Sequence, residues 1–398
     1  MSLSCNEVGL WFAARFEVNY FLHRLSGNEK SMRTASIKLV TLLGLTVIAT
    51  TPRCAPQASL LDDVALVSAS IETDPVSSVD DAADDPAVWV HPVDLQSSLI
   101  VGTDKQFGLE VYGLDGKLRQ RVAAGLTNNV DIRTLPSPWA EGSALLAASN
   151  RTANTISLFI MSPTGELNWL SESEVRTGLD EVYGLCLFKN TDGIQAFIND
   201  KDGRYQQWGF DFESSDHPEQ EFEQSVSALR IRGTLLREFR VTSQPEGCAA
   251  DDENERLFVG VEAEGVFTLD ANAREPAVLT QLAAVDGANL AADVEGMDVF
   301  TIGDAGYLVV SSQGNNTFAL FDRHAPYSYA GSFALTDDAV LNIDGVSDTD
   351  GITASSQIRT PQFPEGLIVV QDGANTMPSA PQNFKLVSWQ VIADALGL

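Results

Sequence analysis

Four aspartates lie within the stretch Asp80–Val90, and two of them, Asp84 and Asp85, directly precede Pro86 and a short apolar run. Uncompensated carboxylates at this density repel one another and raise their own pKa values. A divalent cation removes that repulsion, and calcium in particular accepts six to eight hard oxygen ligands. The same residues also fit a solvated acidic turn before a strand, so the interpretation depends on whether the pattern recurs.

The pattern recurs six times along the chain. Each unit opens with an acidic or amide-rich turn that runs into a short apolar strand, and two further strand-like segments follow. The openings are roughly 50 residues apart, which is the size of a propeller blade of three or four strands. The acids that mark the six openings are Asp85, Asp131, Glu181, Glu246, Glu295 and Asp350.

This repeat predicts an all-β fold, a six-bladed β-propeller. We expect a strand around Val64–Ile71 to close the ring by pairing with the last blade, since it would otherwise be a bare edge. A β-sandwich or two small barrels are the alternatives, but neither explains an acid at the same place in every repeat.

In a propeller the first strand of each blade lines the central channel, and all six begin at the same face. The marker acids, with Asp84, are therefore expected to converge around one mouth, where several calcium ions would neutralise them. Tyr183, Asn128 and Gln313 offer additional neutral oxygens.

Basic residues occupy comparable positions after three of the second strands. Basic residues beside a calcium-rich cleft suggest an anionic ligand that is bound jointly by the metal ions and by these side chains. The three basic residues are Lys105, Arg151 and Lys201.

Composition narrows the possible functions. Lys+Arg 25 against Asp+Glu 55 gives a formal charge of −30, which argues against a nucleic acid or an anionic membrane as partner. The chain has only four histidines and lacks the serine-hydrolase elbow, the zinc-protease helix motif and the phosphate-binding P-loop. If the chain is an enzyme, we expect metal-activated water as the nucleophile. A calcium-dependent propeller lactonase and a non-catalytic binding propeller remain alternatives.

The N-terminal region has the pattern of a secretory signal. The apolar run Ile37–Thr50 follows Arg33 and is shorter than the roughly 20 residues that span a bilayer. We therefore expect residues 1–56 to be an extension and signal peptide that starts at Met32, and residues 57–398 to form a secreted, monomeric propeller domain. For Cys186 and Cys248, buried free thiols are the favoured interpretation, and a disulfide stays open.

Two stretches, Asp81–Val90 and Asn128–Arg133, resemble the signature motifs of the β-propeller phytases. Similar motifs continue in order from Glu72 to the C-terminus, at 180–184, 246–253, 293–296, 311–315, 344–351 and 371–373. The resemblance implies calcium-dependent hydrolysis of phytate (myo-inositol hexakisphosphate), taken as its calcium complex, to lower inositol phosphates and phosphate. In that family a calcium-bridging water attacks phosphorus.

The resemblance also implies residue roles. It implies catalytic roles for Asp85, Tyr183, Glu246, Lys105, Arg151 and Lys201. It implies substrate contacts for Lys105, Arg151, Lys201, Asp202, Tyr183 and Arg133, with Asp202 at a position where the family more often has Glu.

Calcium ligands are expected at both catalytic and structural sites, and Asp344, Asp350 and part of 372–375 are expected to serve the structural ones. Ala374 stands where an acidic ligand would be expected. The full set of expected ligands is Glu72, Asp84, Asp85, Asp131, Tyr183, Glu246, Glu262, Asp293, Glu295, Gln313, Asp344, Asp350, Asp372 and Asn375.

Overall fold

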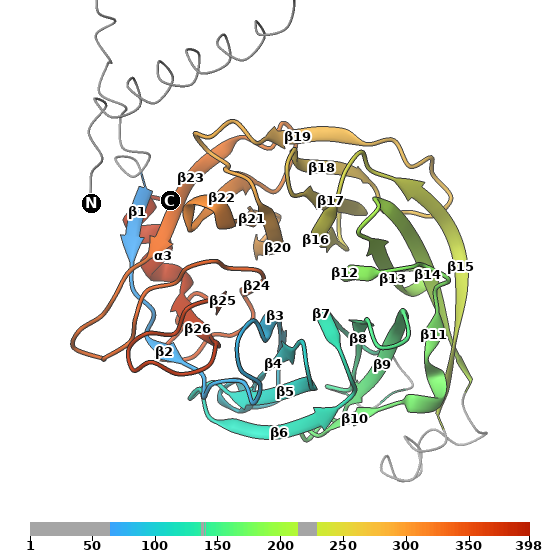
Figure 1. Cartoon of the computed structure of the whole chain (residues 1–398), viewed down its shortest axis with the longest axis horizontal. Coiled ribbons are helices and arrows are strands. Elements are labelled where there is room, and N and C mark those ends of the chain that lie inside the picture. The colour runs from blue at the N-terminus through green and yellow to red at the C-terminus, as the bar shows by residue number, and fades with distance from the viewer. Residues whose placement is uncertain (1–63, 137–138, 140, 214–228) are drawn as a thin grey trace, which may run out of the picture. The chain divides into compact units, whose positions relative to one another are not determined.

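The computed structural model describes residues 64–136, 139, 141–213 and 229–398; the expected signal peptide lies outside these residues. The described residues form six antiparallel sheets that surround a central axis (Figure 1). The all-β, six-bladed propeller predicted from the repeat is therefore confirmed.

The first three blades are consecutive four-stranded sheets, and the short strand β11 (Val175–Arg176) pairs with β9 beside the second. Blade 1 contains β3 (Ala83–Trp89), β4 (Leu99–Asp104), β5 (Gly108–Gly113) and β6 (Leu118–Ala123). Blade 2 contains β7 (Thr127–Thr134), β8 (Ala144–Asn150), β9 (Thr155–Met161) and β10 (Leu167–Trp169). Blade 3 contains β12 (Val182–Asn190), β13 (Gly193–Asp200), β14 (Arg204–Glu213) and β15 (Arg230–Arg240).

The last three blades follow the same order, and the chain ends in the helix α3 (Trp389–Leu396). Blade 4 contains β16 (Pro245–Asp251), β17 (Arg256–Val261), β18 (Gly265–Asp270) and β19 (Thr280–Ala284). Blade 5 contains β20 (Val294–Ile302), β21 (Ala305–Ser312), β22 (Thr317–Asp322) and β23 (Tyr329–Leu335). Blade 6 contains β24 (Ile352–Ser355), β25 (Leu367–Asp372) and β26 (Asn383–Ser388), with β2 (Ile71–Glu72) as its outer strand. Short 3-10 turns lie at Leu95–Ser97, Ser171–Ser173 and Gln313–Asn315.

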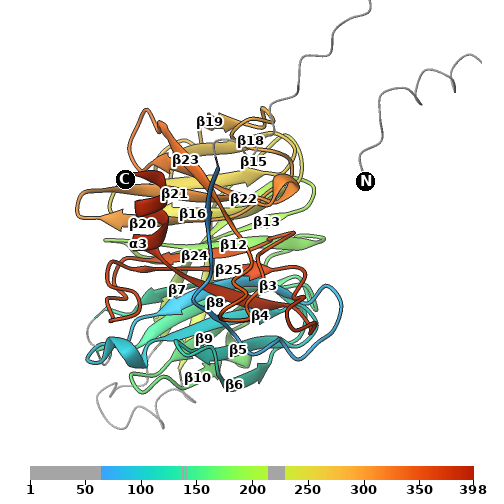
Figure 2. The same cartoon turned by 90° about the vertical axis from the view of Figure 1, so that its left-hand side faces the viewer.

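Two N-terminal strands cover exposed edges. β2 pairs with β26, with Ile71 opposite Leu386, so of the strand expected around Val64–Ile71 only its end closes the last blade. The preceding strand β1 (Val64–Val67) does not join that blade: it runs parallel to β23 of blade 5, and α3 packs beside both (Figure 2). Blade 5 already has four strands, so β1 covers an outer edge that would otherwise be free to pair with another chain.

The apolar side chains form six clusters among the described residues, one between each pair of neighbouring blades. Between blades 2 and 3, for example, Leu145, Leu185 and Ile198 are buried against one another. Each blade thus packs both faces on its neighbours, as strands with few exposed positions require. The ring holds the inner strands β3, β7, β12, β16, β20 and β24 around the axis (Figure 1).

Cys186 and Cys248 form a disulfide between the inner strands of blades 3 and 4, with their Cα atoms 5.7 Å apart. The favoured interpretation of two free thiols is therefore wrong. The two cysteines are 62 residues apart in the chain, and only the ring of blades makes their strands neighbours.

Candidate active site

A β-bulge lies near the start of the inner strand in five blades. In blade 3, Val182 pairs with Asp200 but Leu185 pairs with Ile198, so Tyr183 and Gly184 together face one residue. The same one-residue shift occurs in blades 1, 2, 4 and 5. A bulge of this kind re-aims a side chain, here toward the axis. The first residue of each bulge, together with Asp350 at the equivalent place before β24, forms what we call the mouth ring. Its members are Asp84, Asn128, Tyr183, Glu246, Glu295 and Asp350.

The size of the residue that follows each mouth-ring position limits how closely the backbone of the next blade's inner strand can approach. A Cβ atom on Gly184 would lie 1.7 Å from the carbonyl oxygen of Glu246, and one on Gly351 would lie 2.5 Å from that of Asp84. Glycine at these places therefore lets the backbone of the next inner strand approach, which narrows the mouth ring.

The residue that follows each second strand forms a second circle around the mouth. Its backbone N–H donates to a carbonyl just before the mouth ring, as from Lys105 to Ala82 at 2.7 Å and from Glu262 to Gln244 at 3.1 Å. We call this circle the rim. The rim residue is basic in blades 1–3, acidic in blade 4, a neutral amide in blade 5 and glycine in blade 6. In blade order the rim residues are Lys105, Arg151, Lys201, Glu262, Gln313 and Gly373.

Three glutamates crowd the half of the mouth that belongs to blades 4 and 5. Carboxylate oxygens of Glu246, Glu262 and Glu295 all lie within 4.8 Å of one another, and Glu295 Oε2 is buried without a hydrogen-bond partner. Burial, and then the neighbouring Glu246, raises the pKa of Glu295 well above its usual range. Burial also raises the pKa of Glu262. Among the described residues this group could hold a metal ion, because a cation would remove both the repulsion and the unsatisfied oxygen.

Tyr183 completes this half of the mouth. Burial, and then the neighbouring Glu246, raises the pKa of its phenol. The ammonium of Lys201 lies 4.5 Å from the centre of the Tyr183 ring and 3.1 Å from Glu181 Oε1. Glu181 thus pairs with a rim lysine outside the mouth ring.

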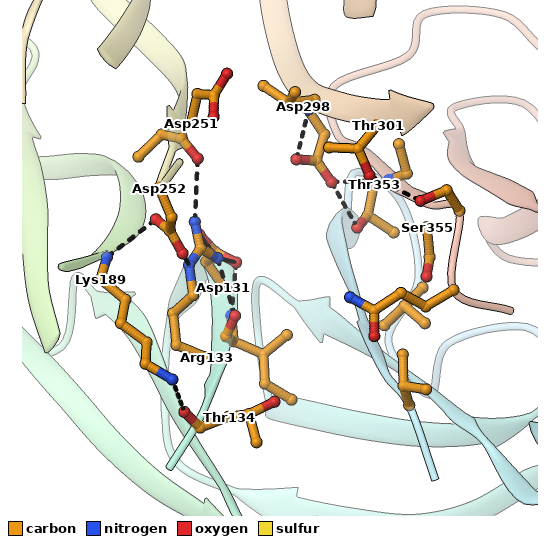
Figure 3. Close-up of a pocket in the computed structure, with 18 of the residues that line it drawn as sticks. Asp131, Arg133, Thr134, Lys189, Asp251, Asp252, Asp298, Thr301, Thr353 and Ser355 are labelled. Atoms are coloured by element: carbon orange, nitrogen blue, oxygen red, sulfur yellow. Dashed lines mark hydrogen bonds and ion pairs between the residues drawn. The ribbon is translucent and has the colours of Figure 1, made fainter. Parts of the chain in front are cut away.

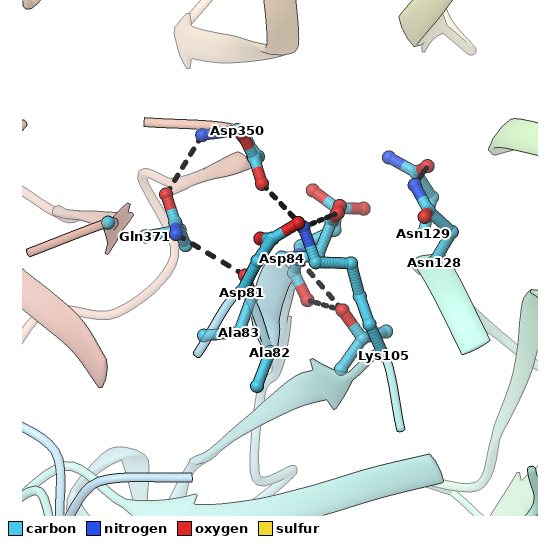
Figure 4. A network of polar contacts seen from close by, with 12 residues as sticks. Asp81, Ala82, Ala83, Asp84, Lys105, Asn128, Asn129, Asp350 and Gln371 are labelled. Carbon is cyan, nitrogen blue, oxygen red and sulfur yellow. Dashed lines mark hydrogen bonds and ion pairs between the residues drawn. The ribbon is translucent and has the colours of Figure 1, made fainter. Parts of the chain in front are cut away.

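The other half of the mouth contains its own cation (Figure 4). Lys105 Nζ lies 2.5 Å from Asp81, 2.9 Å from Asp350 and 3.3 Å from Asp84. Burial nevertheless raises the pKa of Asp350 to about 6 and that of Asp84 well above its usual range. Asp84 Oδ1 and Asn128 Oδ1 stay buried without a partner, so this half also offers open oxygen ligands.

Arg151 and Asp202 occupy different surroundings. Arg151 Nε is buried and has no hydrogen-bond partner among the described residues, so the rim holds a cationic donor that is still open. Asp202 instead accepts hydrogen bonds from Arg204 and from Arg240 on the outer strand β15. The structure therefore does not bring Asp202 to the rim with Lys201.

Asp85 lies one position deeper than the mouth ring. Its Oδ2 accepts a hydrogen bond from the backbone N–H of Val130 at 3.1 Å, and its own N–H donates to Thr103 Oγ1. Burial, and then Asp84, raises the pKa of Asp85. Asp84, rather than Asp85, is the residue equivalent to Glu246 and Glu295.

Asp131 and Arg133 are not at the mouth at all. Because the bulge of β7 falls at 128–129, both side chains lie further along the strand than the mouth ring, where they line a separate cavity (Figure 3). Arg133 pairs there with Asp131 at 2.9 Å and Asp252 at 2.8 Å beside a cavity of about 360 Å³. Asn128 holds the position expected for Asp131, just as Tyr183 holds the position expected for Glu181.

A third acidic cluster lies in blade 6 and contains a lysine. The fully buried Lys385 Nζ lies 2.6 Å from Glu72, 2.6 Å from Asp344 and 3.3 Å from Asp372. Burial alone would raise the pKa of Asp344, but hydrogen bonds from Lys385 and Thr376 outweigh it and lower that pKa. The expected structural calcium ligands thus already surround a positive charge, and sequence reasoning missed the lysine.

The remaining expected ligands lie beside these groups. Gln313 Nε2 donates to Asp350 Oδ1 at 2.7 Å, and its backbone N–H donates to the carbonyl of Asp293. Asn375 Nδ2 donates to the carbonyl of Pro381 beyond β25, while its Oδ1 is buried without a partner.

The fold and the mouth define a six-bladed propeller that gathers acidic ligands for cations beside a basic rim. A family model described as Phytase matches residues 31–398. A 3-phytase of Bacillus subtilis (strain 168) is 37% identical over 344 residues, which covers 83% of this chain and 85% of that protein. The chain belongs to the phytase family.

Proposed function

We propose that this chain is a calcium-dependent phytase that hydrolyses phosphate monoesters of calcium-bound phytate to lower inositol phosphates and phosphate. The single observation that carries the proposal is the arrangement of the mouth. Glu246, Glu262 and Glu295 crowd together, with an unsatisfied oxygen, at a mouth whose rim is basic in blades 1–3. The family and the 3-phytase relative support the same substrate.

The residues present fit calcium at the mouth. Glu246, Glu262 and Glu295 would hold it, and Tyr183 of blade 3 and Asp84 of blade 1 offer further oxygens at the same mouth. Bound calcium supplies positive charge against the phosphate oxygens and lowers the pKa of water. We place the catalytic ions here rather than at Asp344 and Asp372, whose charge Lys385 already offsets.

The rim would bind the phosphates. Arg151 has an open guanidinium donor, and Lys201 carries its charge above the Tyr183 ring, so both are positioned to accept an anionic group between them and the glutamates. Lys105 is tied to three aspartates, which makes it mainly a counter-ion of the mouth. Burial beside Glu246 raises the pKa of the Tyr183 phenol, so it stays protonated, and Asn128 Nδ2 donates a hydrogen bond to Glu246 Oε1 at 3.1 Å that orients this glutamate.

Substrate charge also favours the calcium complex. A protein with a formal charge of −30 repels a free polyanion, whereas calcium phytate approaches with much of its charge neutralised. The buried acids of the mouth have raised pKa values, so they lose protons to calcium most readily at neutral to alkaline pH.

Export is part of the proposal. Residues 1–56 would be the extension and signal peptide, and residues 57–398 the secreted catalytic domain. The Cys186–Cys248 disulfide supports an oxidising compartment. Within the described part of the chain, no helix is long and apolar enough to span a bilayer.

The test is phosphate release from sodium phytate with added calcium, with and without EGTA. Wild type should release phosphate only with calcium, and Glu246→Gln should lose at least tenfold in kcat/KM at limiting calcium. Glu275→Gln changes an exposed glutamate in the same way and should behave as wild type. Release unaffected by EGTA would refute the mechanism, and hydrolysis of lactones alone, or no hydrolysis, would select the alternative functions.

A further inference from the structure

The mouth depends on spacing between blades, and backbone ladders do not set that spacing. β12 and β16 belong to different sheets, so no backbone hydrogen-bond register joins them. At the mouth they are bridged by Asn199 of β13, whose Oδ1 accepts a hydrogen bond from the Gly184 N–H at 2.9 Å and whose Nδ2 donates to the Glu246 carbonyl at 2.9 Å. Both contacts can slide or break without unfolding either blade.

The disulfide joins these same two strands directly beneath the mouth. Cys186 lies three residues beyond Tyr183, and Cys248 lies two residues beyond Glu246. Two or three residues along a strand span about 7–10 Å. The disulfide is therefore about that far along the two strands from Tyr183 and Glu246. Both cysteines are buried, at 2% and 7% exposure.

Repulsion between the glutamates of the mouth makes a covalent link between blades useful there. Glu246 and Glu262 belong to blade 4 and Glu295 to blade 5, so their repulsion in the absence of a cation acts on the position of β16, which the disulfide fixes against β12. No other disulfide links two blades in the described residues, so this boundary alone is held covalently. A preorganised ligand set binds its ion more tightly, because less ordering remains for the binding step.

We propose that the Cys186–Cys248 disulfide is a positioning element of the cation site: it holds β12 and β16 at the separation at which Tyr183 and Glu246 share one divalent cation. This inference rests on the proposed function for its ligand set. It makes cation affinity, and with it phosphate release at limiting calcium, dependent on the oxidised state of the protein.

The experiment compares wild type with Cys186→Ser/Cys248→Ser, both as full mature domains at a temperature well below melting. Calcium affinity is measured by isothermal titration calorimetry. Terbium emission excited through tyrosine is a second readout, since Tyr183 lies at the site. We expect the double variant to bind calcium at least fivefold more weakly and to lose tyrosine-sensitised terbium emission. Saturating calcium should restore its kcat for phytate.

A second variant separates positioning from general stability. Leu320→Ala removes a buried side chain between blades 5 and 6, far from this boundary, and should lower the melting temperature while leaving calcium affinity unchanged. If the double cysteine variant binds calcium as wild type does, or if Leu320→Ala weakens binding equally, the positioning role is refuted. If wild type itself binds no calcium, the proposed function fails instead.

Discussion

Substituting Glu295 by glutamine should stabilise the calcium-free protein. At 4.8 Å and an effective dielectric constant of about 20, each like-charge pair costs about 3 kcal/mol, and Glu295 takes part in two such pairs. Protonation of Glu295 limits the penalty to about 1.4 kcal/mol for each pH unit above its ordinary pKa of 4.5, or about 5 kcal/mol at pH 8. Glutamine fills the same volume, and Glu295 Oε2 has no hydrogen bond to lose.

We therefore expect Glu295→Gln to raise the free energy of unfolding in EGTA at pH 8, by at most about 5 kcal/mol. A raised folded-state pKa means that the carboxyl destabilises the fold as pH rises from the ordinary pKa toward the folded one. The gain should thus fall below about 1 kcal/mol at pH 5. The same variant removes a calcium ligand, so its calcium affinity should fall at least tenfold.

Urea denaturation in EGTA at both pH values, followed by calorimetric calcium titration, measures these opposite effects. Glu275→Gln, an exposed substitution of the same chemistry, should change neither quantity. A Glu295→Gln protein that is less stable than wild type without calcium at pH 8, or that binds calcium normally, would refute the like-charge account of the mouth.

Three further predictions test other parts of the molecule. Arg151→Ala should raise KM for phytate about tenfold through loss of a charge-assisted hydrogen bond, with an unchanged melting temperature; steady-state kinetics with a normal KM would contradict it. Lys385→Met leaves the buried carboxylates of Asp344 and Asp372, and the half-buried one of Glu72, without their cation and should cost about 3–5 kcal/mol in urea denaturation; a loss below 1 kcal/mol would show that another cation neutralises them. Burial, and then Asp131, raises the pKa of Asp298 from 3.8 to about 6, so its carboxyl loses about 3 kcal/mol of stability as pH rises between those values. The stability of Asp298→Asn relative to wild type should therefore be about 2 kcal/mol higher at pH 7 than at pH 4, and a pH-independent difference would exclude a buried charge.

Half of the mouth ring could be read directly from the repeat. Glu246, Glu295 and Asp350 were assigned their correct positions, and each is followed by glycine. Tyr183 is also followed by glycine. The Tyr183-Gly184 pair would therefore have identified Tyr183, in place of Glu181, as the mouth-ring residue of blade 3. Blades 1 and 2 carry Asp85 and Asn129 instead of glycine. No sequence signal there separates the mouth-ring residue from its neighbours.

The ion pairs of the two buried lysines, Lys105 and Lys385, could not be read from the sequence. Lys105 was expected beside the substrate, yet it lies among Asp81, Asp84 and Asp350, because residues 245 positions apart meet at the closure of the ring. Lys385 alternates with apolar residues in its strand and carries no local sign of an ion pair. Asp372 lies on the paired strand β25, but Glu72 comes from β2 and Asp344 from the segment before β24, and only the fold brings these two to the lysine.

The amino-acid sequence by itself determined the number of blades, their strand order and the supply of acids and bases around each opening, because hydrophobic alternation and turn residues act over a few positions. Only the tertiary structure decided which of those acids face the axis, which are matched by a buried lysine or arginine, and which two cysteines meet. These outcomes depend on one-residue bulges and on contacts between blades, and a bulge turns a side chain to a new direction without changing the local pattern of residues.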